Sequence, residues 1–218
     1  SGKKGGVAIL MQAARNYRVW ILFVSYAACF GIEIFIHNVA AMYYVDHFNM
    51  GLKEAGLTAG IFGLLALFAR ALGGIISDKV AVSKGLDGRT KILFILILCE
   101  GLFLMLFSQM NVISLAIISM TVFALFTHMA CGATYALVPF IDRNALGGVA
   151  GIIGAGGNVG AVAAGFLLKG LLDVQTCLMI LGGLVTVAAF SVILIRFSVE
   201  HKAKEHQLFE QAILERNS

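Results

Sequence analysis

Charged side chains are scarce in this sequence, and this scarcity limits the classes of protein to which it can belong. Asp, Glu, Lys and Arg make up 13% of the 218 residues, whereas hydrophobic residues make up 60%. Soluble domains carry about 25% charged residues. The mean hydropathy of +0.93 points the same way. The composition therefore argues against a water-soluble protein and predicts one that is embedded in a membrane.

The sequence also lacks the patterns that hold metals, cofactors or nucleic acids. Its four cysteines, Cys29, Cys99, Cys131 and Cys177, all lie within apolar runs, and none belongs to a CxxC pair. Such spacing supports neither a zinc site nor a disulfide framework. The net charge of +4 comes without a basic stripe interleaved with aromatic residues, so no nucleic-acid partner is expected. We predict no enzyme activity, no catalytic residue, no metal and no cofactor.

Six long apolar runs are present instead. A helix that crosses a membrane needs about 20 predominantly apolar residues. The runs cover residues 17–44, 55–76, 92–108, 112–138, 145–168 and 176–197, and Pro139 ends the fourth. We therefore predict an all-α membrane protein with a six-helix transmembrane bundle over residues 17–198. Residues 1–16 are expected to form an N-terminal segment or linker, and residues 199–218 a charged, helix-prone tail.

Basic residues are distributed unevenly among the connections. Of the sixteen Lys and Arg residues, four lie before or at the start of the first run, four lie between the second and third, one lies between the fourth and fifth, and four lie at or after the end of the sixth. The connections on the other side hold only Lys53 and Lys169. Because basic loops stay in the cytoplasm, both termini are predicted to be cytoplasmic, in a plasma or inner membrane.

Arg70 is the remaining basic residue and lies inside the second run. An arginine at the centre of a membrane helix costs about 2.5–3.5 kcal/mol on insertion scales, so it needs a partner or a water-filled cavity. It could snorkel, or form an internal ion pair with Glu33 or Glu100. It could also bind an anion, because a guanidinium presents a rigid fork of donors to a small planar oxyanion. The residues alone leave these interpretations open.

A polar stripe runs along the first apolar segment. Tyr26, Phe30, Glu33 and His37 follow a spacing of four, three and four residues, so they share one helix face. For the two aromatic residues, ordinary helix packing is the more common explanation. Glu33 and His37 could serve as a protonation site or could hold Arg70 in place.

Two more polar side chains interrupt apolar runs. His128 in the fourth run is a weaker candidate for function, because a histidine there is more often satisfied by an interhelical hydrogen bond. Glu100 stands alone in the third run, and the sequence assigns it no role.

The fifth run is rich in glycine, with nine of the chain's 25 glycines in or just after it. The segment from Gly154 to Gly160 is not a nucleotide-binding loop, because it lacks the GxGxxG spacing and no strand precedes it. Two pairs with small-xxx-small spacing predict close helix approach: Gly147/Gly151 and Gly156/Gly160. A functional interpretation adds a mobile helix beside a substrate path, with Asn158 as its one strong polar side chain.

A short charged motif begins in the last residues of the second run and continues beyond it. It contains Gly74, Asp78 and Arg89 and lies at a predicted cytoplasmic helix end. Asp78 could pair with Arg89, meet a helix N-terminus, or remain a solvated loop charge.

Together these segments resemble the nitrate/nitrite porter family of the major facilitator superfamily. Residues 74–89 resemble the superfamily's cytoplasmic loop motif, and residues 154–160 resemble the family's second nitrate signature. Residues 25–31, 68–74 and 130–140 resemble its seventh, eighth and tenth transmembrane helices. The resemblance runs from about Asn16 to Lys169, with Ala71 standing where many relatives have proline.

The resemblance implies helices seven to twelve, the C-terminal half of a twelve-helix porter, with the substrate pocket at its interface with an N-terminal half. That half, which carries a second substrate arginine and the first signature, lies outside this chain. The substrate-binding residues that the family implies here are Arg70, Tyr26, Phe30, Gly154, Gly157 and Asn158. The residues that it implies for conformational change are Gly74, Asp78, Arg89, Gly156 and Gly160.

The implied function is transport of nitrate or nitrite across a lipid bilayer by alternating access. Proton symport would need a titrating group, for which Glu33 is the first candidate and His37 the second, whereas nitrate/nitrite exchange needs none. Other functions stay open: a half-porter for another small anion or a drug, and a non-transporting membrane sensor or partner subunit.

Overall fold

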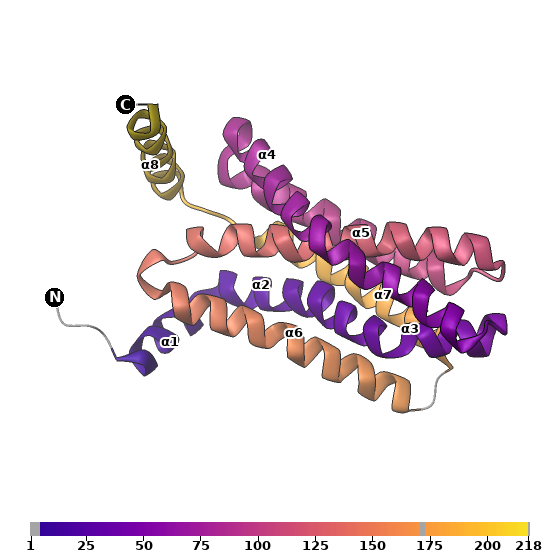
Figure 1. Cartoon of the computed structure of the whole chain (residues 1–218). Coiled ribbons are helices and arrows are strands. Elements are labelled where there is room, and N and C mark those ends of the chain that lie inside the picture. Colours follow the sequence, from indigo (N-terminus) through magenta and orange to yellow (C-terminus); the bar gives the residue numbers. More distant parts are fainter. Residues whose placement is uncertain (1–4, 171–172, 218) are drawn as a thin grey trace.

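The computed structural model describes residues 5–170 and 173–217, and nearly all of these residues are helical (Figure 1). In chain order the α-helices are α1 (Gly6–Ala14), α2 (Tyr17–Tyr26), α3 (Ile32–Phe48), α4 (Leu52–Ser108), α5 (Ile113–Leu137), α6 (Leu146–Lys169), α7 (Val174–Ser191) and α8 (Val199–Asn217). Four shorter turns join them: the π-helix η1 (Ala27–Gly31) and the 3-10 helices η2 (Val138–Phe140), η3 (Arg143–Ala145) and η4 (Val192–Leu194). The long helices pack side by side, which confirms the predicted all-α bundle.

The first long helix is continuous from Tyr17 to Phe48, because η1 joins α2 to α3 without a break. Asn16 caps its start by accepting a hydrogen bond from the backbone N–H of Arg18 at 3.1 Å. Asn49, whose φ of 51° is left-handed, ends it. In its middle, η1 is a π-helical turn, a widening that occurs frequently at functional sites. The predicted run 17–44 is therefore correct in type but ends four residues early.

Helix α4 covers 57 residues and consists of two arms that meet at Gly85. A straight helix of this length would be about 86 Å long, far more than the hydrocarbon core of about 30 Å. Gly85 has φ 57° and ψ −148°, a conformation that glycine adopts readily. Figure 1 shows the chain turning back at this end of α4. The predicted runs 55–76 and 92–108 are the two arms, and the connection expected as a loop is helical on both sides of Gly85.

Five helices in the described residues are long and apolar enough to cross a membrane. They cover Tyr17–Phe48, Leu52–Ser108, Ile113–Phe140, Arg143–Lys169 and Val174–Leu194. Because the two arms of α4 can each cross the membrane, these five helices account for the six predicted crossings. The sixth predicted run extends to residue 197, but the chain leaves the helix after Leu194, where Ile195 adopts an extended conformation.

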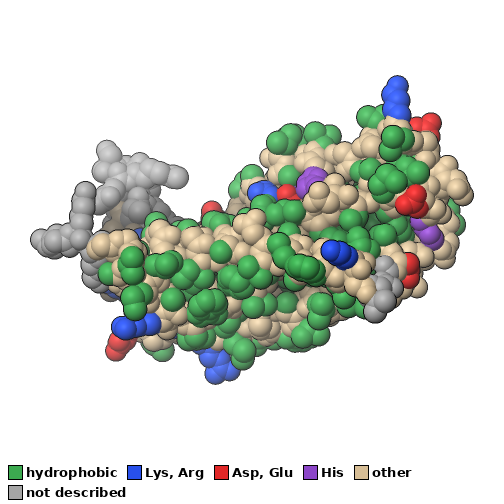
Figure 2. Space-filling model, turned by 90° about the horizontal axis from the view of Figure 1, so that it is seen from below, with side chains coloured by type: hydrophobic (Ala, Val, Ile, Leu, Met, Phe, Trp, Pro, Cys, Tyr) green, Lys and Arg blue, Asp and Glu red, His purple; other side chains and the backbone are tan. Residues whose placement is uncertain are grey.

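Apolar side chains divide between the interior of the bundle and its outer surface. Phe62 and Phe123 are fully buried, whereas Leu67 and Phe68 are 71% and 70% exposed. Figure 2 shows hydrophobic side chains spread over one face, with few charged ones among them. Such a surface suits a lipid environment, in which the outside of the protein is as apolar as its inside.

Both ends of the described chain lie at the same end of the bundle (Figure 1). Helix α1 packs on the start of α6, since a β-carbon built at Gly148 would lie 2.8 Å from the carbonyl oxygen of Ile9. Part of the predicted N-terminal segment is therefore a docked helix rather than a linker. Of the basic residues counted there, Lys3 and Lys4 lie outside the described residues.

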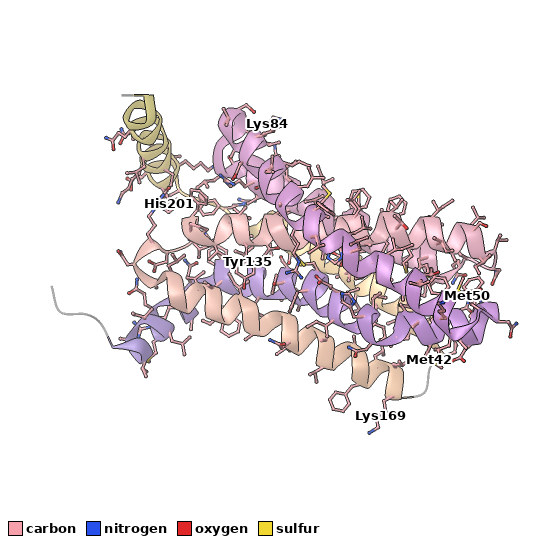
Figure 3. All side chains as sticks on the ribbon, viewed as in Figure 1. Met42, Met50, Lys84, Tyr135, Lys169 and His201 are labelled. Atoms are coloured by element: carbon pink, nitrogen blue, oxygen red, sulfur yellow. The ribbon has the colours of Figure 1, made fainter. Side chains whose placement is uncertain are left out.

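The predicted tail forms helix α8, which is tied to the bundle by two ion pairs. The Lys202 ammonium donates to the Asp87 carboxylate at 2.6 Å, and Arg143 pairs with Glu205. In Figure 3, Lys84 and His201 lie toward this end, whereas Lys169 lies at the opposite one. The last residue, Ser218, lies outside the described residues.

Candidate anion-binding site

Arg70 lies in the first arm of α4 and pairs with Glu33 on α3, not with Glu100. Its Nη2 atom donates to both carboxylate oxygens of Glu33 at 2.6 Å. Its Nε atom is buried and has no hydrogen-bond partner. The Arg70 side chain is 38% exposed, whereas that of Glu33 is 7% exposed. The guanidinium thus pairs with a buried carboxylate while part of its side chain is exposed, and its Nε–H donor is not used.

Two aromatic rings extend this site along the first long helix. The rings of Tyr26 and Phe30 stack with their centroids 5.0 Å apart and 8° between their planes. The Arg70 guanidinium carbon lies 5.3 Å from the Phe30 centroid, within cation–π range. Tyr26 ends α2 and Phe30 lies within η1, so the π-helical turn carries this pair. The residues predicted to share one face do lie along one surface that leads to Arg70.

Helix α6 brings Gly157 against both rings. A β-carbon built there would lie 2.4 Å from Phe30 Cδ1 and 3.1 Å from the Tyr26 ring, so only glycine allows this approach. A β-carbon built at Gly154 would lie 3.2 Å from the hydroxyl oxygen of Tyr135. Asn158 does not join the site. It is exposed and donates to the Gly154 carbonyl of its own helix at 3.4 Å.

The predicted close approach of α6 is confirmed for one glycine pair and is wrong for the other. β-Carbons at Gly156 and Gly160 would each lie 2.4 Å from a carbonyl oxygen of the first long helix, those of Phe23 and Ala27. Gly147 and Gly151 have nothing within 4 Å. That pair follows the same spacing but points away from the neighbouring helix.

Two histidines flank Glu33. The fully buried His128 on α5 places Nε2 2.8 Å from the carbonyl oxygen of Phe62. Its Nδ1 lies 3.3 Å from Glu33 Oε2, which is an ion-pair distance but not a hydrogen bond of standard geometry. His37 is half exposed, with Nε2 3.9 Å from Glu33 Oε1. The interhelical hydrogen bond expected of His128 is present, but its second nitrogen faces the site.

Cys131 and Tyr135 are residues of this site that the sequence analysis missed. The Cys131 thiol donates to Glu33 Oε2 at 3.7 Å, and the Tyr135 ring meets Tyr26 edge-on with centroids 5.0 Å apart. Figure 3 places Tyr135 within the bundle, between its long helices. Together with His128 they follow a spacing of three and four residues, so one face of α5 lines the site. That spacing was the available signal.

The charged motif at the α4 turn forms a separate cluster. Arg89 pairs with Asp78, which was one of the open alternatives, and its guanidinium carbon lies 4.7 Å from the Phe140 ring centroid. Gly74 has nothing within 4 Å, whereas a β-carbon at Gly73 would lie 2.0 Å from the Met129 carbonyl oxygen. Gly73, the residue before the motif's Gly74, therefore allows α4 and α5 to approach closely.

Glu100, on the second arm of α4, is fully buried, and neither carboxyl oxygen has a hydrogen-bond partner. Its titratable neighbours include Cys29 and Glu33, and the nearby Thr127 hydroxyl donates to the Phe123 carbonyl oxygen. The residue thus lies near the site without an ion pair of its own among the residues described. Within the same residues, no group of three or more His, Cys, Asp and Glu could hold a metal ion, and all four cysteines are free.

Comparisons with known proteins agree with this architecture. Residues 21–216 match the family described as the Major Facilitator Superfamily. The chain is 42% identical over 154 residues to the high affinity nitrate transporter 2.5 of Arabidopsis thaliana, covering 71% of this chain and 31% of that protein. It is 38% identical over 193 residues to the high affinity nitrate transporter 2.7 of Arabidopsis thaliana. That match covers 88% of this chain and 39% of that protein.

A bacterial relative extends the similarity. The nitrate/nitrite transporter NrtP of Picosynechococcus sp. is 30% identical over 149 residues, covering 67% of this chain and 27% of that protein. The chain therefore spans about a third of the length of the curated relatives that it matches. The apolar helices and the family match together show an integral membrane protein. The chain belongs to the Major Facilitator Superfamily, and within that superfamily it is similar to nitrate and nitrite transporters.

Proposed function

We propose that this chain forms the C-terminal half of a porter that moves nitrate or nitrite across a membrane by alternating access. The observation that carries the proposal is Arg70, a guanidinium inside the bundle that packs on Phe30 and keeps a buried Nε without a partner. Similarity to nitrate transporters supports the choice of anion.

The side chains around Arg70 suit a small, flat anion. A guanidinium donates two parallel hydrogen bonds to a planar oxyanion, and its Nε is unused in this conformation. The stacked rings of Tyr26 and Phe30 offer apolar faces beside it. Gly157 keeps these rings in place by leaving room for them. Arg70 is the group that binds the charge, and the rings favour a flat ligand.

The other wall of the pocket would come from a partner half of the porter, because substrate sites in such porters lie near the bilayer midplane between two halves. The glycine contacts of α6 with the first long helix would let the two surfaces slide during the conformational change. The pair of Asp78 and Arg89 would brace the turn of α4 at the cytoplasmic end. In this arrangement both termini are cytoplasmic, in a plasma or inner membrane.

Glu33 is the proposed coupling group, with His37 as the second candidate. Glu33 occupies Nη2 of Arg70 in this conformation, so it competes with the anion for the same cation. A proton that weakens this ion pair would release Arg70 to the anion, and so the two ligands would be taken up together. Exchange of nitrate for nitrite would need no such proton.

Replacement of Arg70 by lysine in the full-length protein tests the proposal. Arg70→Lys keeps the positive charge but loses the planar fork, and we expect nitrate uptake to lose about tenfold or more in affinity, since hydrogen bonds to charged groups contribute about 1.5–3 kcal/mol. Arg15→Lys, at an exposed position, is the matched control and should transport as the wild type does. Wild-type nitrate affinity in Arg70→Lys would rule out this site.

Competition distinguishes nitrate transport from transport of another anion or a drug. Nitrate and nitrite should each compete with labelled nitrate for uptake, whereas chloride and sulfate, which are not planar, should compete poorly. Stronger competition by sulfate or by an organic drug would replace the substrate assignment. A full-length protein that binds nitrate but never moves it would instead be a sensor.

A further inference from the structure

His128 is held in one orientation by its contact with α4. Its Nε2 lies 2.8 Å from the carbonyl oxygen of Phe62, and the ring is fully buried. A carbonyl oxygen can only accept a hydrogen bond, so Nε2 carries a hydrogen. Nδ1 is then the one ring nitrogen whose protonation can change.

Nδ1 of His128 faces the carboxylate of Glu33, at 3.3 Å from Oε2. In a neutral ring with its hydrogen on Nε2, Nδ1 presents a lone pair, and an ionised carboxylate also only accepts. Two acceptors facing each other in a low-dielectric interior repel. A proton between them replaces this repulsion with a charge-assisted contact.

The remaining neighbours of Glu33 donate to it or lie further away. Arg70 Nη2 donates at 2.6 Å and the Cys131 thiol at 3.7 Å, so the carboxylate acts as the acceptor. The other titratable groups that face the pair are His37 on α3, at 3.9 Å, and Glu100 on the second arm of α4. His37 is 43% exposed, whereas His128 is enclosed.

We propose that Glu33 and His128 together bind one proton, and that this proton sets the charge of the anion site. With the proton, Arg70 and His128 are positive and Glu33 is negative, which leaves one net positive charge. Without it the site is neutral. A monovalent anion is therefore held best by the protonated site, and each ligand raises the affinity for the other.

The proton would come from solvent, and the 38% exposed side of Arg70 is the route that the proposal requires. It returns to solvent when the anion leaves. No other atom is transferred and no electron moves. The link to nitrate rests on the proposed function, but the proton site does not, so each can be tested separately.

The proton site is tested without nitrate by NMR of the full-length protein labelled with nitrogen-15 in histidine. His128→Gln identifies the signals of His128; if that variant does not fold, replacing the other histidines of the full-length protein in turn, including the four others in this chain, identifies them by elimination. We expect both ring nitrogens to carry protons at low pH, and Nδ1 alone to lose its proton as the pH rises. A bare Nδ1 at every pH at which the protein stays folded would overturn the proposal.

The link to the anion is tested by measuring nitrate affinity as a function of pH by calorimetry. Because one proton is bound with each anion, wild-type affinity should fall by up to about tenfold per pH unit above the pH at which Nδ1 loses its proton. His128→Gln should remove this dependence, whereas His47→Gln, on the same helix as Glu33 but outside the site, should keep it.

The outcomes separate the two proposals. A wild-type slope in His128→Gln, or loss of the slope in His37→Gln alone, would overturn the role of His128. A protonated Nδ1 in a protein that binds no nitrate would support the proton site and overturn the proposed substrate.

Discussion

Two buried glutamates lie near each other in this bundle, and their surroundings differ in almost every respect. Glu33 on α3 accepts hydrogen bonds from Nη2 of Arg70 and from the Cys131 thiol, and Nδ1 of His128 lies close to it. Glu100 on α4 is more deeply buried, yet neither of its oxygens has a hydrogen-bond partner. One carboxyl group accepts hydrogen bonds from its neighbours, and the other accepts none of standard geometry.

The difference teaches how a membrane bundle accommodates an acidic residue. A carboxylate removed from water is tolerated as an ion only where a cation and hydrogen-bond donors replace its hydration. Glu33 meets this condition, so it can act as a charged group beside Arg70. Glu100 does not, and it is accommodated far more cheaply as the neutral acid. Of these two acids, only the one at the proposed anion site is thus placed to carry a charge.

The largest expected effect comes from removing the charge of Glu33. Glu33→Gln leaves the Arg70 guanidinium without its carboxylate, which should cost about 1–3 kcal/mol of stability. The loss is smaller than that for a fully enclosed ion pair, because Arg70 is partly exposed and water can replace some of the interaction. Thermal or denaturant unfolding of the purified protein measures it. Unchanged stability would mean that the ion pair contributes nothing to the fold.

A smaller effect, of opposite sign, is expected at Glu100. Glu100→Met removes an unsatisfied polar group and fills the space with an apolar chain of similar shape, so stability should stay the same or rise by about 1 kcal/mol. The same unfolding measurement applies, with Glu54→Gln at an exposed position of α4 as the control. Should Glu100→Met instead lose as much as Glu33→Gln, Glu100 would have a partner that matters, and the contrast between the two sites would disappear.

The smallest effect is expected at His37. Its nitrogen lies 3.9 Å from Glu33 and its side chain is 43% exposed, so the interaction is screened by solvent. His37→Gln should change stability by less than about 0.5 kcal/mol. Comparison with His128→Gln sharpens the argument. That variant removes a buried ring whose Nε2 bonds to the Phe62 carbonyl oxygen, so it should lose more stability than His37→Gln. A larger loss in His37→Gln than in His128→Gln would reverse their assigned importance.

Much of the site could be predicted because its residues follow helix periodicity. Tyr26, Phe30 and Glu33 share a face by their spacing, and Arg70 stands out as a charge in an apolar run. Asn158 looked equally suitable by residue type, but it bonds to its own helix and faces outward. The rotation of α6 shows in which glycines meet the neighbouring backbone, and the four-residue spacing that both pairs share does not distinguish Gly147/Gly151 from Gly156/Gly160.

By itself the sequence determined that this protein is a membrane-embedded helical bundle and where its helices run, because a helix satisfies its backbone locally and an apolar run shows its length directly. Only the tertiary structure decided which acid pairs with Arg70. Glu33 and Glu100 are both acidic residues in apolar helices, and the sequence left both open as partners of Arg70. The packing of α3, α4 and α5 brings Glu33, His128 and Arg70 to one point and leaves Glu100 without donors.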